Sequence, residues 1–150
     1  MSANDTKRMP RLGLFAAVVL VYVLAWFLPV HTSGKTLRDG VLPGWEAFSV
    51  ALDIHGEEDW GVVSATIARA SALTNLLMVG AMVLLLRRGG RVEPRRWLAW
   101  AFVAATIIDL WWARGGANND RSDLLWGYWL WMSSFALMAA WLFITRQRRA

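Results

Sequence analysis

The sequence contains no cysteine among its 150 residues. This absence excludes disulfide exchange, thiolate metal sites, haem attachment through thioether bonds and catalysis by a cysteine nucleophile. Histidine is almost as scarce, because only His31 and His55 are present and both lie outside the long apolar segments of the chain. A four-helix cytochrome, which holds haem between pairs of histidines inside its helices, is therefore excluded.

Short motifs of known chemistry are also missing. The sequence has no G-x-S-x-G, no H-E-x-x-H, no phosphate loop and no dinucleotide fingerprint. We therefore expect no cofactor, and a protein without catalytic activity is favoured over an enzyme. The net charge of +5 does not indicate nucleic acid, because the arginines lie directly beside apolar segments, where they set topology and contact lipid headgroups.

Charged residues make up only 18% of the chain, whereas 57% of its residues are hydrophobic. The apolar residues fall into four segments, at about 12–30, 61–86, 96–113 and 124–145. Each segment approaches the roughly 20 residues that cross a bilayer as a helix. The sequence predicts an all-α integral membrane protein, a single domain over 1–150 that forms a bundle of four transmembrane helices. The first segment is longer than the apolar core of a secretory signal, so we interpret it as a retained span.

The basic residues predict the orientation of these spans. Most of them lie in the N-terminal tail, between the second and third spans, and in the C-terminal tail, whereas the 31–60 loop is acidic. Since basic loops stay on the cytoplasmic side, both termini are predicted to be cytoplasmic. The frequent tryptophan and arginine and the short loops are typical of the bacterial inner (cytoplasmic) membrane.

The outer loop, residues 31–60, is long for a plain linker. Its stretch 41–52 predicts a short helix that starts near Pro43 and lies in the interface or covers the bundle. A substrate lid or a partner-docking element is the alternative, with Trp45 and Glu46 as candidate residues. His55, among the acidic residues of 53–59, is a further candidate, but the spacing matches no metal loop and we expect a solvated acidic loop without metal.

Polar residues recur at one depth of the four predicted spans. A rise of about 1.5 Å per residue places them roughly 17–20 Å from the cytoplasmic boundary. They are Tyr22, Asn75, Asp109 and Ser133. Arg69 lies about two turns above this layer. An ionisable residue inside a span needs a partner, a polar cavity or a function, so these five residues form the predicted intramembrane site.

Small and polar residues share one face on each of two spans. On the second span the face is Ser64, Ala68, Ser71 and Asn75, and on the third span it is Ala101, Ala105 and Asp109. Small residues let helices approach closely, and polar side chains then bond across the contact. We therefore expect these faces to pack together, with Asp109 bonded to Asn75, to Arg69 or to both.

Three functions remain open from the sequence. The first is a non-catalytic accessory or interaction subunit, in which the polar layer fixes helix register. The second is a small oligomeric transporter or channel, in which Asp109 carries a proton or a cation. The third is a membrane enzyme acting on lipid-like substrates through Asp109, Arg69 or the His55 loop. The expected partners are the lipid bilayer and a membrane protein or further copies of the chain, and no nucleic acid.

Overall fold

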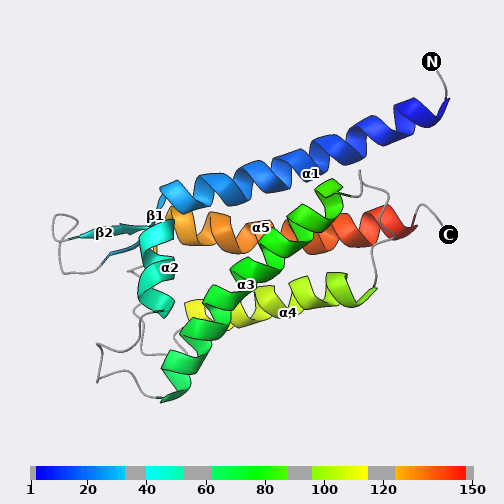
Figure 1. Ribbon diagram of the computed structural model, residues 1–150. Coiled ribbons are helices and arrows are strands. Elements are labelled where there is room, and N and C mark those ends of the chain that lie inside the picture. The colour runs from blue at the N-terminus through cyan, green and yellow to red at the C-terminus, as the bar shows by residue number, and fades with distance from the viewer. Residues whose placement is uncertain (1–2, 33–39, 53–61, 88–95, 115–123, 148–150) are drawn as a thin grey trace.

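Four long helices make up most of the structure, a computed structural model that describes residues 3–32, 40–52, 62–87, 96–114 and 124–147. They are α1 (Ala3–Phe27), α3 (Val62–Arg87), α4 (Arg96–Ala113) and α5 (Trp126–Gln147). The predicted all-α fold is confirmed, since each of the four apolar segments is helical. The ends of α1 and α5 that carry the two chain termini lie at the same end of the bundle (Figure 1).

Helix α5 is the centre of the bundle. It packs along both α1 and α4, and α3 packs against α4. Figure 1 shows α1, α4 and α5 running side by side while α3 crosses them obliquely. The bundle is therefore three aligned helices with a fourth laid across them.

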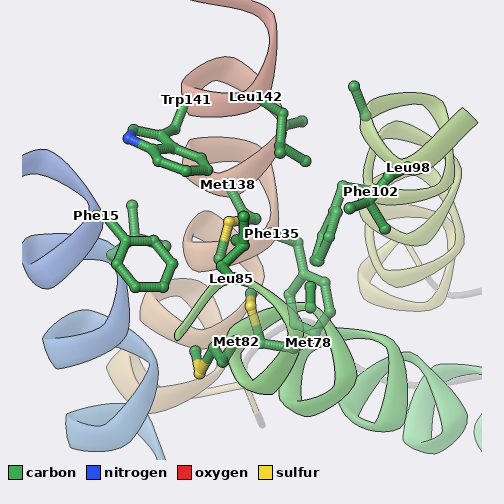
Figure 2. Close-up of a cluster of buried hydrophobic side chains, with 14 of the residues drawn as sticks. Phe15, Met78, Met82, Leu85, Leu98, Phe102, Phe135, Met138, Trp141 and Leu142 are labelled. Carbon is green, nitrogen blue, oxygen red and sulfur yellow. The ribbon is translucent and has the colours of Figure 1, made fainter. Parts of the chain in front are cut away.

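The apolar core lies toward the end of the bundle that carries the termini. All four long helices contribute to it (Figure 2). Its fully buried large side chains include Met78, Phe102, Phe135 and Met138. The rings of Phe102 and Phe135 lie 6.0 Å apart between their centroids, which joins α4 to α5. Close packing of these side chains accumulates many small dispersion contacts, which hold this half of the bundle together.

A small cap closes the other end. Strand β1 (Pro29–Thr32) pairs antiparallel with β2 (Val41–Pro43), and the short helix α2 (Gly44–Leu52) follows. Pro29 fits the end of α1 at Phe27, because proline disfavours helix at the residue before it. The cap is tied to α5 by the backbone, since the N–H of Leu125 donates to the carbonyl of Val30 at 2.9 Å.

Two glycines permit the cap to approach the helices. A Cβ on Gly44 would lie 2.6 Å from the carbonyl oxygen of Ala25, and one on Gly127 would lie 2.5 Å from that of Pro29. The predicted short helix is present, but it begins at Gly44, after Pro43. Residues 41–43 form a strand that was not predicted, because pairing with β1 decides their conformation.

Two helical stretches are long and apolar enough to cross a membrane, as judged by length and composition within the described residues. They are Thr66–Arg87 and Trp126–Thr145. The apolar part of α1, Gly13–Phe27, is shorter. The core helix of a soluble protein meets the same criterion of length and composition.

Candidate functional site

The side-chain oxygen of Asn75 joins three helices. The hydroxyl of Tyr22 on α1 donates to Asn75 Oδ1 at 2.9 Å, and the indole N–H of Trp131 on α5 donates to the same oxygen at 2.8 Å. The amide nitrogen of Asn75 donates to the carbonyl of Ala72 in its own helix at 3.1 Å. Asn75 thus connects α3 to both α1 and α5.

Asp109 on α4 is the centre of a second group of hydrogen bonds. Its side chain is fully buried, with 0% of its surface exposed. The hydroxyl of Ser71 on α3 donates to Asp109 Oδ1 at 2.7 Å, and the hydroxyl of Tyr128 on α5 donates to the backbone carbonyl of Asp109 at 2.5 Å. The second carboxyl oxygen, Oδ2, is buried and has no hydrogen-bond partner among the described residues.

The two groups are neighbours and form one polar cluster, which we define as Tyr22, Ser71, Asn75, Asp109, Tyr128 and Trp131. Ser71 and Asn75 are one turn apart on α3, and the rings of Tyr128 and Trp131 lie 5.6 Å apart on α5. The polar cluster therefore has members on all four long helices. It lies between the cap and the apolar core.

Three of the five residues of the predicted intramembrane site are in this cluster: Tyr22, Asn75 and Asp109. The carboxyl of Asp109, however, is bonded to Ser71 and not to Asn75 or Arg69. Arg69 is exposed. It lies two residues from Ser71, which places it roughly 200° around the helix and so on the far side of α3.

Ser133 does not join the polar cluster. Its hydroxyl donates to the carbonyl of Trp129 in the same helix at 2.7 Å. Its neighbour Ser134 is the buried serine of this pair, and its hydroxyl donates to the carbonyl of Trp131. Position along the helix predicts how high a residue lies in the bundle but not the direction in which its side chain points, and adjacent residues point about 100° apart around a helix.

Three cluster members were not among the predicted site residues. Ser71 was predicted only as part of the packing face of the second span. The other two are Tyr128 and Trp131 on α5. A signal was available, since they are three residues apart and therefore share one face of α5. Both side chains carry a polar tip that takes a hydrogen-bond partner when buried. Two such residues on one face, level with Asp109, point toward a shared polar site.

The outer-loop candidates lie apart from the polar cluster. Trp45 is exposed on α2, and the backbone carbonyl of Glu46 accepts a hydrogen bond from Ser49 at 2.8 Å. His55 lies outside the described residues. Within the described part of the chain, no group of three or more His, Cys, Asp or Glu side chains could hold a metal ion.

No family model, curated protein or solved structure matches this chain.

Replacing Asn75 with leucine is expected to lower the free energy of unfolding by about 2 kcal/mol, because two donors, on the buried Tyr22 and the partly buried Trp131, lose their shared acceptor. The matched control is Ser133→Ala, which removes a polar group that bonds only within its own helix. It should change stability by less than about 0.5 kcal/mol. Equilibrium unfolding of the purified protein measures both, and equal losses would contradict the role assigned to Asn75.

Proposed function

We propose that the protein is a multi-pass protein of the bacterial cytoplasmic membrane, a bundle of four transmembrane helices with both termini in the cytoplasm. Its role is that of a non-catalytic accessory subunit that binds another membrane protein. The observation that carries this proposal is the exposure of large apolar side chains on the outside of the bundle, combined with a buried polar cluster beside the apolar core inside it.

The apolar exterior supports membrane insertion. Leu76 is 62% exposed, Ile107 61% and Leu20 58%, and these residues belong to three different helices. Large apolar side chains are exposed on each of the four long helices, whereas soluble proteins rarely expose large apolar patches. The interior holds the fully buried Asp109 and Ser134 and the hydrogen-bonded Asn75. Polar residues that face the inside of a bundle are the pattern expected of membrane helices.

Exposed tryptophans mark both ends of the bundle. Trp97 and Trp100 are exposed on α4 near the end that carries the termini, whereas Trp45, Trp111 and Trp126 are exposed near the cap. Indole rings favour the two membrane interfaces. Their separation along the helices supports a bundle that spans the full hydrocarbon layer, with the cap on the outer side.

The accessory role is supported by how the interior polar groups are used. Tyr22, Asn75, Ser71 and Tyr128 bond to one another, to Asp109 or to backbone groups that they bring together. These bonds fix the helices relative to one another and hold the polar side chains in place. The lipid-enzyme alternative loses support, because Arg69 lies on the opposite side of α3 from Ser71, the residue that holds Asp109.

The absence of cysteine gives a direct test of topology by single-cysteine labelling. A membrane-impermeant maleimide should label Ser49→Cys in intact cells and Gln147→Cys only after the membrane is opened. Leu20→Cys should stay unlabelled in both conditions, although the structure exposes Leu20, because lipid covers it. Labelling of Leu20→Cys in the native membrane would contradict the membrane assignment.

Native mass analysis of the protein, extracted gently from its own membrane, tests the accessory role. A different membrane protein is expected to accompany it at fixed stoichiometry, because a subunit with no chemistry of its own acts through a partner. A homo-oligomer alone would contradict this role and favour the transporter.

Transport is the second candidate, and the observation that favours it is the buried Oδ2 of Asp109, which has no hydrogen-bond partner in the part of the chain that the structure describes. A small oligomeric transporter or channel would use this carboxyl to bind a proton or a cation. If the accessory role is correct, vesicles that contain the protein should show no proton or cation flux above protein-free vesicles. Flux that Asp109→Asn abolishes, while Ser133→Ala leaves it unchanged, would establish the transporter instead.

A further inference from the structure

The outward face of α3 carries a continuous row of exposed residues. We call it the α3 stripe, and its members are Arg69, Leu73, Leu76, Gly80 and Val83. They follow one another at intervals of four, three, four and three residues. This is the spacing at which one helix presents a seam to a second helix. The α3 stripe lies on the opposite side of α3 from Ser71, Asn75 and Met78, which face the bundle.

Gly80 leaves a notch in the middle of the stripe. A Cβ built on Gly80 would meet no atom within 4 Å, so the position is open. Leu76 and Val83 lie one turn away on either side along the helix. In a bilayer, a small residue between larger ones lets a second helix approach backbone to backbone. Glycine lowers helix stability by about 1 kcal/mol relative to alanine, so helix propensity does not explain why position 80 is a glycine.

Arg69 puts a positive charge on the same stripe. It lies about five turns before Arg87, the last residue of α3, so roughly 27 Å along the helix axis. Because α3 crosses the other helices obliquely (Figure 1), the depth of Arg69 across the bilayer is smaller than this axial distance. An arginine that faces the hydrocarbon layer is costly and calls for an opposite charge. The stripe therefore calls for a carboxylate opposite Arg69.

The described residues of the four long helices in a second copy of the chain do not supply that carboxylate. Within the described residues of the four long helices, the acidic side chains are Asp5, near the start of α1, and the fully buried Asp109. Two copies in the same membrane orientation that met along this stripe would also bring their Arg69 side chains toward each other. Like charges in a medium of low dielectric constant repel strongly.

We propose that the α3 stripe binds one transmembrane helix of a different membrane protein, which carries a carboxylate in its outer half. That carboxylate pairs with Arg69, and the backbone of the partner helix packs on Gly80 between Leu76 and Val83. This inference rests on the proposed membrane location and accessory role, and it adds the binding surface and the chemistry of the partner.

The test uses the full-length protein, labelled with a donor fluorophore and reconstituted in phosphatidylcholine vesicles. The probe is an acceptor-labelled Leu/Ala transmembrane peptide with one glutamate in the leaflet that holds Arg69, compared with the same peptide carrying glutamine. The glutamate peptide should associate about tenfold more tightly, because it neutralises a charge that hydrocarbon does not solvate. Arg69→Gln should remove this preference.

Matched glycine variants distinguish binding at the α3 stripe from a general effect of placing leucine on a helix surface. Gly80→Leu should weaken association of both peptides, because it fills the notch. Gly13→Leu on α1, where a Cβ also meets no atom within 4 Å, should leave association unchanged. Equal effects of the two substitutions, or equal binding of the two peptides, would overturn the proposal.

Two other occupants would each produce a distinct result. If Arg69 binds a lipid phosphate, the glutamate preference is absent and Arg69→Gln changes only the affinity of the protein for vesicles with anionic lipid. If a second copy covers the stripe, Gly80→Cys forms a disulfide dimer in vesicles without peptide. If Leu20→Cys stays protected from maleimide, either result overturns the docking proposal and leaves the membrane location standing. Labelling of Leu20→Cys overturns the membrane location itself.

Discussion

The two hydrogen bonds accepted by Asn75 Oδ1 fix how α1, α3 and α5 fit together. In the proposed membrane location, apolar contacts alone specify the rotation of a helix weakly, because a leucine packs against lipid or against a helix about equally well. A directional acceptor shared by Tyr22 and Trp131 does specify it. Turning α3 by a single residue would rotate Asn75 by about 100° and break both bonds. The polar cluster therefore sets the faces that every helix presents, inside and outside.

That constraint reaches the outward surface of α3. Because Asn75 and Ser71 point inward, Arg69 and Gly80 point outward. The rotation of α3 that forms the interior hydrogen bonds is thus the same rotation that places the proposed docking surface outside. A protein that presents such a surface needs a rigid frame behind it, and the connections from α3 to α1, α4 and α5 supply one. This link between a bonded interior and a presented face is why a structural polar cluster fits an accessory subunit.

The sequence predicted the helices and the small and polar face of the second apolar segment, because long apolar runs and helical spacing are local signals. It did not predict that Ser71 holds Asp109, because depth along a helix gives height and not rotation. For the same reason the sequence predicted Ser133 as a site residue, although Ser134 is the buried serine. The strands β1 and β2 are only four and three residues long, and their pairing depends on residues distant in sequence, as in the bridge between His31 and Leu124.

The position of Asp109 bears on the choice between the two proposed functions. Its carboxyl lies near the cap, since α4 ends one turn later at Ala113. Toward the end of the bundle that carries the termini, the next turns of the helices bring the fully buried Met78, Phe102 and Phe135. A proton or a cation bound at Asp109 would have to cross this apolar core, so transport requires the helices to separate there. A helix-fixing role requires no such opening, and the close packing of these side chains favours it over transport.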